Sequence, residues 1–557
     1  KFLYRDPDDP EAEPVVVLPY GGFYNRAEDF LLSYDFRNSV NYSTVVNEKH
    51  SVNLLGGMQV KSADRQNFSN TGYGYQYDNG GLPAPDYRIL KQTIESNFPY
   101  YEMGKDYDRF VAFYATGNYT FNSKYNFTAT GRYDGSNRLG KSSTARWLPT
   151  WSVAASWNVD RESFMRDVDW LDNLLFRASY GLTASMGPAN NSNVVLRSIN
   201  ANRPYLSERE SVIQLASLEN SELTWEKSYT ANIGIDATLL DRRLNVSIDV
   251  YQRKSFDLIS IIKTSGIGGE AYKAANYADM NSWGSELLLG GEIVRGRNWG
   301  WKSSLTVGYN ENQITNAKNI PDIFSLVVAE GGNKEGYPVR SLFSINYKGL
   351  DHNTGIPQFV DENGKTAAAV YLQDQKTEHL VYEGPVDPPL NGGFSNTFHY
   401  KAFSANIFIT YQAGNKIRLY PAFKTYYSDL DAMPREFNDR WVLPGDELLT
   451  NVPSIVEAFE AAQLNAAYPY NNYNYSTQRV AKGDFIRLKT VSLSYQLSAN
   501  TIQRIGFNSV SFTATAANLW LIYADKKLKG QDPEFFNSGG VAQPIQKQIT
   551  LSVKLGI

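Results

Sequence analysis

The 557-residue chain has no cysteine, only four histidines and no long uncharged apolar run. Without cysteine it cannot be a disulfide scaffold. We expect no transmembrane helix, because no window of about 18 uncharged apolar residues occurs. The 54 basic and 58 acidic residues nearly cancel, to a net charge of −4. This balance argues against a nucleic-acid groove as the main surface, so we expect no nucleic-acid partner.

Catalytic and metal-binding motifs are also lacking. The four histidines, His50, His352, His379 and His399, form neither an HExxH motif nor a Cys/His metal pattern. Acidic residues are plentiful, but a sequence does not give the separation of two carboxylates that glycosidase chemistry requires. We therefore expect no enzyme activity, no metal site and no cofactor.

Aromatic residues, in contrast, are abundant. The chain has 38 Tyr, 28 Phe and 10 Trp, which excludes intrinsic disorder. Its mean hydropathy is −0.42. A transmembrane β-barrel keeps such a polar average because its lipid face alternates with a polar face. A secreted all-β binding protein would share this composition. Residues 1–14 have neither a basic n-region nor an apolar h-region, so no signal peptide is expected there.

The dominant pattern is the alternation of apolar and polar residues with a period of two. Residues 229–239 and 244–252 alternate in this way, and the short turn 240–243 separates them. Such a pair is typical of a hairpin with one apolar face. A soluble sandwich would show the same alternation, but its strands usually run about 5–6 residues. Several of these runs are longer, and about 9–11 tilted residues span a bilayer.

This pattern predicts an all-β, antiparallel transmembrane β-barrel. About fifteen spanning strands are expected, near 31–46, 50–60, 111–121, 125–133, 150–159, 174–182, 225–239, 243–256, 282–292, 299–310, 394–400, 403–412, 485–496, 509–519 and 546–556. Residues 1–30 are expected to be the remnant of an extracellular loop, and 31–557 the barrel portion. Its long extracellular loops would be 61–110, 183–224, 257–281, 311–393, 413–484 and 520–545. The remaining strands are joined by short turns, and short turns at one end with long loops at the other are typical of outer-membrane barrels.

The odd number of strands predicts an incomplete wall. A closed single-chain bacterial barrel has an even strand count, with both ends on the short-turn side. With fifteen strands, the first starts on the long-loop side and the last ends on the short-turn side. We therefore expect the C-terminal portion of a larger barrel, with an open or partner-completed wall at residues 1–46.

Several segments resemble the SusC/RagA family of TonB-dependent outer-membrane transporters, in the family's order and over nearly the whole chain. They are Glu48–Gly57, Gly131–Gly140, Leu148–Trp157, Leu174–Thr183, Leu223–Ile259, Met280–Leu289, Gly349–Lys365, Asp439–Asp446, Asp484–Tyr495 and Ala514–Trp520. The resemblance implies a 22-stranded barrel in the outer membrane of a Gram-negative bacterium, with an N-terminal plug. The plug and the first seven strands would lie upstream of this chain.

The resemblance also implies partners. These are a SusD-like surface lipoprotein that caps the barrel, the upstream plug and first strands, and the TonB complex, reached through that upstream part. Membrane lipid would surround the barrel, and a dimer of transporter–lid pairs is a further option. The implied function is import of large nutrients, either oligosaccharides or peptides.

Two groups of residues are candidates for the functional site. Charged residues on the polar strand faces should point into the lumen, since charge on the lipid face is costly: Arg177, Asp236, Asp249 and Glu286. Loop residues that combine aromatic faces with amides suit contact with a substrate or the lid: Tyr73, Tyr75, Tyr77, Tyr468, Tyr470, Asn471, Asn472, Tyr473 and Tyr475. The alternatives for these loop residues are a packed loop interior or an interfacial aromatic girdle. Trp147, Trp151 and Trp157 are expected in that girdle or the strand beneath it.

Residues 454–467 have helical spacing and predict a short helix within the loop 413–484, with Ser454 as its N-cap. The Tyr/Asn loops slightly favour oligosaccharide over peptide as the substrate. Two other functions stay open. One is a passive structural or adhesive outer-membrane barrel. The other is a secreted β-rich carbohydrate-binding protein or enzyme, which the long strands and the absent acid/base motif disfavour.

Overall fold

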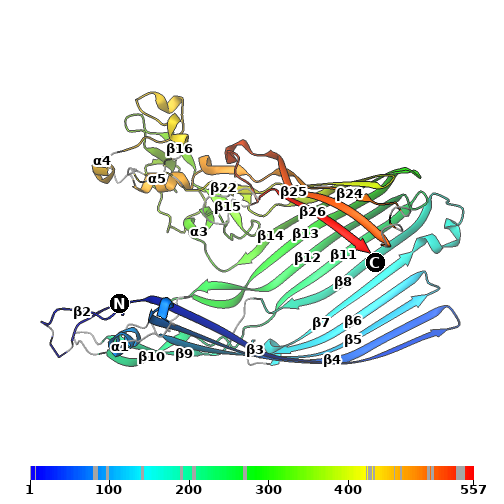
Figure 1. Ribbon diagram of the computed structural model, residues 1–557, viewed down its shortest axis with the longest axis horizontal. Helices are drawn as coiled ribbons and strands as arrows, with labels where there is room; N and C mark the ends of the chain where they lie inside the picture. The colour runs from blue at the N-terminus through cyan, green and yellow to red at the C-terminus, as the bar shows by residue number, and fades with distance from the viewer. Residues whose placement is uncertain are drawn as a thin grey trace.

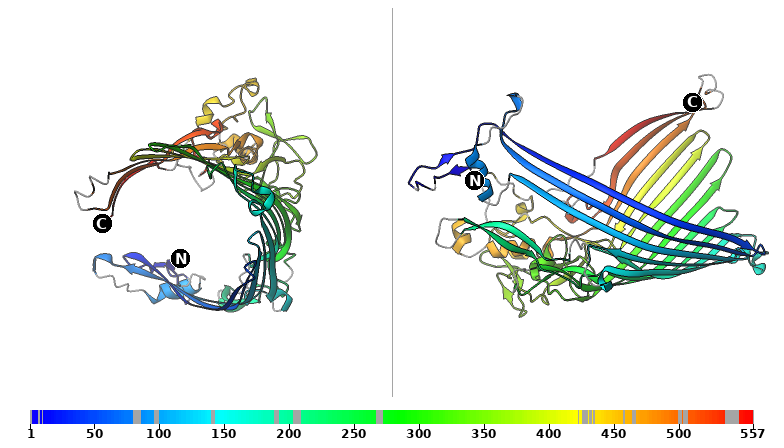
Figure 2. Two further views of the ribbon diagram at one scale, coloured as in Figure 1. Left: turned by 90° about the vertical axis from the view of Figure 1, so that its right-hand side faces the viewer. Right: turned by 90° about the horizontal axis from the view of Figure 1, so that it is seen from below.

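The computed structural model describes all residues except 1, 7, 10, 80–85, 96–99, 140–142, 188–191, 203–208, 267–271, 422, 425–429, 431, 432, 434, 457, 464–466, 499–501, 503–506, 535–545 and 557. Its main feature is one antiparallel sheet that curls into an open arc (Figures 1 and 2). The sheet contains fifteen strands, and each pairs with the next sheet strand along the chain.

The strands of the large sheet are β3 (Gly22–Val46), β4 (His50–Tyr75), β5 (Tyr101–Phe121), β6 (Tyr125–Ser136), β7 (Trp147–Asn158), β8 (Leu171–Ser185), β11 (Glu226–Leu239), β12 (Leu244–Lys263), β13 (Tyr272–Arg295), β14 (Trp299–Ala317), β20 (Leu390–Tyr400), β21 (Phe403–Ala413), β24 (Phe485–Gln496), β25 (Ser509–Ala524) and β26 (Gln548–Gly556). All fifteen expected strands are therefore confirmed. β3 and β26 are the two edges, and the left view of Figure 2 shows the gap between them. The predicted open wall at residues 1–46 is confirmed.

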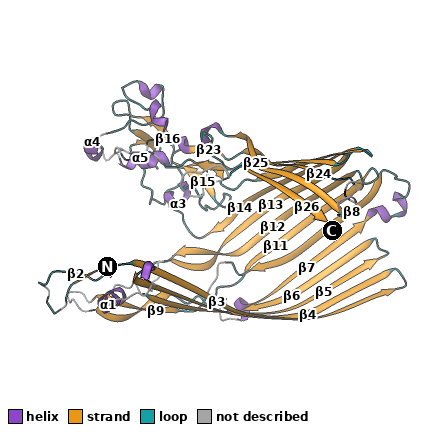
Figure 3. Ribbon diagram, in the orientation of Figure 1, coloured by secondary structure: helices purple, strands orange, loops and turns teal. Residues whose placement is uncertain are grey.

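Within the described residues, smaller strands form five short sheets: β1 (Leu3–Tyr4) with β2 (Val15–Val16), β9 (Val195–Asn202) with β10 (Arg209–Ser217), β15 (Ser341–Ser344) with β19 (Val381–Pro385), β16 (Tyr347–Leu350) with β17 (Pro357–Val360) and β18 (Thr366–Ala367), and β22 (Lys416–Arg418) with β23 (Val480–Lys482). The α-helices, purple in Figure 3 together with the 3-10 helices, are α1 (Tyr87–Glu95), α2 (Ser143–Arg146), α3 (Ile323–Val327), α4 (Ala458–Gln463) and α5 (Ala467–Asn474). The 3-10 helices are η1 (Tyr77–Asn79), η2 (Val159–Arg161), η3 (Ser163–Met165), η4 (Arg435–Asp439), η5 (Asp446–Leu448), η6 (Thr477–Arg479) and η7 (Lys526–Leu528). No helix in the described ranges is long and apolar enough to cross a membrane.

Several predicted boundaries were wrong. Segment 61–110 is not one loop, because residues 61–70 of β4 pair with residues 101–110 of β5. β3 likewise begins at Gly22, inside the segment expected to be a loop remnant, and the β9–β10 hairpin lies within 183–224. These extensions carry polar residues on both faces, so the alternation that marks a half-buried strand is lost there. The right view of Figure 2 shows the long blue strands near the N-terminus.

The helix predicted over 454–467 is shorter in the structure. α4 begins at Ala458, so Ser454 lies four positions before it. The Ser454 hydroxyl instead donates to the carbonyl oxygen of Thr354, at 2.8 Å. Residues 457 and 464–466 of the predicted helix lie outside the described ranges.

The tight turns of the sheet use left-handed backbone conformations. Asn47 and Glu48 have φ of 51° and 57° between β3 and β4, and Asn122 and Ser123 have 52° and 56° between β5 and β6. Two consecutive residues with positive φ match the right-handed twist of the flanking strands, which is why such turns dominate hairpins. The short turns expected near 47–49 and 122–124 are confirmed.

The register separates the sheet into two chemically distinct faces. Residues directly opposite in antiparallel strands share a face, so a chain of pairs crosses the whole sheet on one side. One such chain, here called the polar row, contains Ser51, Thr120, Asn126, Ser156, Arg177, Gly234, Asp249 and Glu286. The neighbouring row of paired residues, displaced by one residue on each strand, lies on the opposite face and is here called the apolar row. It contains Val52, Tyr119, Phe127, Ala155, Ala178, Ile233 and Val250.

Candidate functional site

Charged residues form a cross-strand network on the polar face of the sheet. Arg177 donates from Nε to Asp236 Oδ2 at 2.6 Å and from a terminal nitrogen to Asp249 Oδ2 at 3.0 Å. Ser247 completes the network by donating to Asp236 Oδ1 at 2.6 Å. The structure therefore brings together three of the four predicted lumen residues. The fourth, Glu286, pairs in register with Asp249 and is exposed.

Gly234 leaves room for this network. It lies between Arg177 and Asp249 in the polar row. A Cβ atom at this position would lie 2.5 Å from Asp249 Oδ1 and 2.9 Å from an Arg177 terminal nitrogen. A side chain would therefore make the Asp249 carboxylate or the Arg177 guanidinium shift, so the absence of a side chain at Gly234 favours their close approach.

Two long connections fold together at one end of the sheet. Residues 318–389 join β14 to β20, and residues 414–484 join β21 to β24; we call their described residues the loop platform (Figure 1). They share one hydrophobic core, built from Ile323, Leu326, Val327, Phe343, Ile345, Phe359, Val370, Leu372, Leu380, Phe423, Phe437 and Tyr473. Because both connections supply core residues, neither can fold this way alone.

A buried arginine connects the parts of the loop platform. The Arg418 side chain is 2% exposed. Its guanidinium donates to the carbonyl oxygens of Val327, Phe343 and Ser476 and to the Ser344 hydroxyl, at 2.6–3.0 Å. Burial lowers the pKa of Arg418 to about 9. The side chain therefore stays protonated at neutral pH and holds three chain segments at once.

The last long connection packs against the loop platform as well. Leu528, which is 1% exposed, lies in a small core with Ile417, Leu419 and Ala481. Arg487 on β24 forms a buried ion pair with Asp532 and a second ion pair with Glu534, at 2.9 Å. Three successive connections are thus tied into one folded surface.

The Tyr/Asn run 468–475 is mainly an interior element of this surface. Tyr470 is 1% exposed and donates its hydroxyl to the Ser454 carbonyl oxygen. The Asn472 amide exchanges two hydrogen bonds with the backbone of Val370, at 2.9 and 3.0 Å. In this conformation, Tyr470 and Asn472 are too buried to contact a substrate or the lid directly. The prediction of such contact is corrected for these two residues, and the alternative of a packed loop interior is favoured. Tyr468 and Asn471 are exposed and stay candidates.

Tyr473 is buried, and Tyr475 is half-buried. Tyr473 packs edge-on against Phe423, with 5.0 Å between ring centroids, and burial raises the pKa of its phenol. It nevertheless borders the pocket described below. Tyr475 is half-buried against Phe324, and burial raises its pKa too.

The N-terminal tyrosines lie far from this run along the chain. Tyr73 is 3% exposed and packs with Val17 and Ile89, so it too is structural in this conformation. Tyr75 stacks on Tyr24, with ring centroids 4.8 Å apart. Tyr77 is 67% exposed and stays a candidate for contact with a ligand or partner.

A pocket of about 520 Å³ lies between the loop platform and residues 527–529. Glu436 pairs here with Arg479 at 2.7 Å and with Lys529 at 3.1 Å. Other lining residues offer acceptors, donors and apolar surface: Asp439, Glu447, Leu448, Leu449, Thr450, Asn451, Gln478 and Lys527. This mixture suits a ligand rich in hydroxyl or amide groups.

A turn at the rim of this pocket is held by a carboxylate network. Glu447 accepts from the Trp441 indole at 3.1 Å and from the Gly445 amide at 2.9 Å, and its other oxygen lies 2.7 Å from His352 Nδ1. The bond with His352 contributes most to lowering the pKa of Glu447 to about 2. The turn that these hydrogen bonds hold presents Leu448 and Leu449, each 86% exposed.

Sequence reasoning missed the buried arginines of this folded surface, of which Arg479 lines the pocket. Arg418, Arg479 and Arg487 are all buried, although charged residues are rarely fully buried. Their spacing in sequence gave no signal. Their partners Val327, Glu436 and Asp532 lie 91, 43 and 45 positions away along the chain. Among the described residues, no group of three or more His, Cys, Asp or Glu side chains could hold a metal ion.

Comparisons with known proteins agree with this architecture. A family model described as "TonB dependent receptor-like, beta-barrel" matches residues 16–519. TonB-dependent receptor P39 of Formosa agariphila is 26% identical, over 98% of this chain and 54% of its own length. TonB-dependent receptor SusC of Bacteroides thetaiotaomicron is 25% identical, over 98% of this chain and 52% of its own length.

Solved structures show the same fold. A structure of the RagAB peptide transporter superposes with a TM-score of 0.79 at 22% identity, covering 96% of this chain and 56% of that chain. The RagAB peptide importer in its closed-closed state gives the same TM-score and identity over 99% of this chain. The chain spans about half the length of the curated relatives it matches.

Proposed function

Because the chain belongs to the TonB-dependent receptor-like β-barrel family and is of the SusC/RagA type, we propose that it forms part of the wall of an importer for large nutrients. Members of this family lie in the outer membrane of Gram-negative bacteria, and they are receptors and transporters rather than enzymes. The transport activity, its substrate and its partners are the proposal.

The two faces of the sheet support this assignment. The apolar row suits contact with lipid, and the polar row, with Arg177 and Asp249, suits a water-filled lumen. In a bilayer, unpaired strand edges are costly because lipid offers no hydrogen-bond partner. We therefore propose that further strands of the same transporter pair with β3 and β26, and that an upstream plug fills the lumen and links it to the TonB complex.

The observation that carries the proposal is the folded loop platform with its polar pocket. A passive barrel has no need for two connections that share one core and a third that packs against them and is held by ion pairs to β24. We propose that this surface receives substrate and meets a SusD-like surface lipoprotein, with the exposed Leu448 and Leu449 at the contact. A dimer of such transporter–lid pairs is compatible with this arrangement.

The proposed substrate is an amphipathic oligomer, either an oligosaccharide or a peptide. The burial of Tyr470 and Asn472 removes two of the residues that favoured oligosaccharide. The charged pocket walls, with Glu436 and Asp439 facing Lys527 and Lys529, can bind hydroxyls as well as the charged ends of a peptide.

Uptake by living cells tests the proposal. Strains that carry the intact transporter, or a deletion of it, would be given fluorescent oligosaccharides and fluorescent peptides, with and without an uncoupler of the proton gradient. We expect transporter-dependent uptake of one class that the uncoupler abolishes. Transporter-dependent uptake whose rate does not change when the uncoupler is added would instead indicate a passive barrel.

A pocket variant sharpens this test. Asp439→Ala combined with Lys529→Ala should reduce uptake by about tenfold, the effect of losing about 1.4 kcal/mol of binding. The matched control is Glu362→Ala, which removes an exposed carboxylate elsewhere on the loop platform. Equal uptake by the pocket variant and the control would exclude the pocket from the substrate path.

A further inference from the structure

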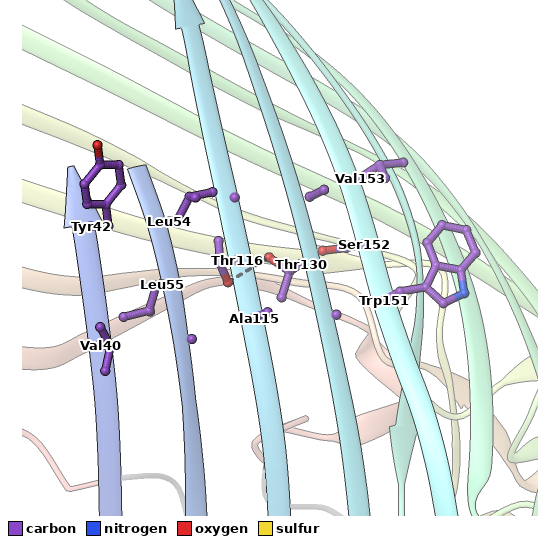
Figure 4. Close-up of a pocket in the computed structure, with 14 residues that line it drawn as sticks. Val40, Tyr42, Leu54, Leu55, Ala115, Thr116, Thr130, Trp151, Ser152 and Val153 are labelled. Atoms are coloured by element: carbon purple, nitrogen blue, oxygen red, sulfur yellow. Dashed lines mark hydrogen bonds between the residues drawn. The ribbon is translucent and has the colours of Figure 1, made fainter. Parts of the chain in front are cut away.

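The apolar face of the sheet contains a groove of about 770 Å³ near its N-terminal edge (Figure 4). We call it the outer groove. Its floor is made of small residues on β4, β5 and β6: Gly56, Ala115, Gly117, Ala129 and Gly131. Larger side chains from β3, β4 and β7 wall it: Val40, Tyr42, Leu54, Trp151 and Val153. The large side chains are all exposed.

The register explains why the floor and walls share one face. Gly56, Ala115, Gly131 and Trp151 lie directly opposite one another on successive strands, and so do Leu54, Gly117, Ala129 and Val153. These two rows are two residues apart and therefore lie on the same side of the sheet, that of the apolar row. Thr116 and Thr130, hydrogen-bonded at 3.3 Å in Figure 4, belong to the intervening row on the other face.

For two of the floor glycines, no contact or backbone angle in the described residues requires glycine. A Cβ atom added to Gly56 or to Gly131 would meet nothing within 4 Å, and neither residue has a positive φ. Glycine in a strand interior weakens the strand and offers no side chain to pack. Gly234 differs from these two, because a Cβ atom there would lie too close to the side chains of Asp249 and Arg177. The open space above Gly56 and Gly131 therefore points to something outside the sheet.

The outer groove lies between two aromatic bands on the same face. On the short-turn side are Tyr119 and Phe127, followed by Tyr125 stacked on Trp157 at 6.3 Å. On the long-loop side Phe113 faces Tyr133 across the strands. Aromatic side chains gather at the two water interfaces of a membrane barrel. The groove between these bands therefore lies at the depth of the hydrocarbon core.

We propose that the outer groove is a binding site for an acyl chain of an outer-membrane lipid. Thr116, Thr130 and Ser152 also border the groove, but the rest of its lining is apolar and continues the apolar face of the sheet. A smaller apolar cavity, of about 150 Å³, already holds a benzene molecule, so the outer groove has room for a flexible hydrocarbon chain. The small floor brings that chain against the backbone of three strands, while Tyr42 and Trp151 limit its sideways movement. This site does not depend on which nutrient is imported.

A photoreactive lipid tests the site directly. The intact transporter would be reconstituted in vesicles of phosphatidylethanolamine and phosphatidylglycerol that contain phosphatidylethanolamine with a diazirine in the middle of one acyl chain. After illumination and digestion, mass spectrometry locates the lipid adducts. We expect adducts on the floor and walls of the outer groove at about tenfold the level of other outer-face positions, such as those around Ile233.

Two matched variants separate a groove from general lipid contact. Gly131→Phe fills the groove and should lower labelling of β4 to β6 by about tenfold. Ala231→Phe places the same side chain on the same face of β11, outside the groove, and should leave that labelling unchanged. Folding of both variants is checked by the heat-dependent shift in gel mobility of a closed barrel. Even labelling of the outer face in the unmodified protein would overturn the proposal without any variant.

A second arm identifies the occupant in cells. A benzophenone amino acid at Ala115 would be illuminated in living bacteria, and the mass of the adduct measured. A lipid-sized adduct that persists in a strain without the partner lipoprotein supports a membrane lipid. An adduct to a second copy of the chain, or one to the acylated anchor of a lipoprotein, would overturn the assignment.

Discussion

Arg418 provides the sharpest test of how the loop platform is held together. In Arg418→Met the side chain keeps most of its length but loses every donor. Three backbone carbonyl oxygens and one hydroxyl then lose their partner in a buried site. Each buried acceptor left unpaired costs about 1–3 kcal/mol, and relaxation recovers part of this loss. We expect a net destabilisation of about 3–5 kcal/mol from these four unpaired acceptors after relaxation.

Hydrogen exchange of the detergent-extracted transporter measures this effect. Because 1.4 kcal/mol corresponds to a factor of ten, protected amides of residues 318–389 and 414–484 should exchange roughly two to four orders of magnitude faster. The sheet strands should keep their protection, since their hydrogen bonds do not involve Arg418. The control is Arg340→Met, which removes an exposed ion pair with Asp387 on the same loop platform and should cost about 0–1 kcal/mol.

The reasoning would be refuted by either of two results. Unchanged exchange in Arg418→Met would mean that the shared core alone holds the loop platform. Loss of protection in the sheet strands as well would mean that the loop platform is not an independent folding unit.

Three further predictions concern other contacts. Since the pKa of Glu447 in the folded protein is lowered to about 2, the ionised carboxylate stabilises the rim turn fully above the ordinary carboxyl range, and this stabilisation is lost as the pH falls toward 2. The fluorescence of Trp441 should report this loss. Glu447→Gln should abolish the pH dependence of the fluorescence. Gly234→Ala should destabilise the sheet by about 1 kcal/mol by separating a partly exposed ion pair, whereas Gly56→Ala should not; urea unfolding in detergent compares them. Tyr470→Ala should cost about 3–5 kcal/mol, by leaving a cavity and an unpaired carbonyl, and accelerate proteolysis of the loop platform; normal proteolysis with weakened substrate capture would instead restore a contact role.

The strand count and faces of the sheet follow from local patterns. Residues 229–239 and 244–252 alternate strictly, and β11 and β12 appear where this alternation predicts them. The left-handed turns at Asn47 and Asn122 also lie where the alternation stops. Period-two alternation reports on a strand with two different environments, and a barrel wall between lipid and water is such an environment.

The same logic explains the missed boundaries. Beyond the bilayer, β4 and β5 continue with Lys61, Asp64 and Arg65 on one strand and Asp106 and Asp108 on the other. Both faces of these extensions are polar, so the pattern resembles a loop. Only backbone pairing between the two strands identifies them as sheet.

The sequence alone determined that this chain forms an open wall of alternating strands with tight turns at one end and long connections at the other. Tertiary structure decided which loop residues are buried, that Arg418 joins three segments, and that Gly56 and Gly131 share the floor of one groove. The physical reason is distance along the chain. Alternation is set by neighbouring residues, whereas the loop platform and the outer groove depend on residues from separate strands and loops that only the folded sheet brings together.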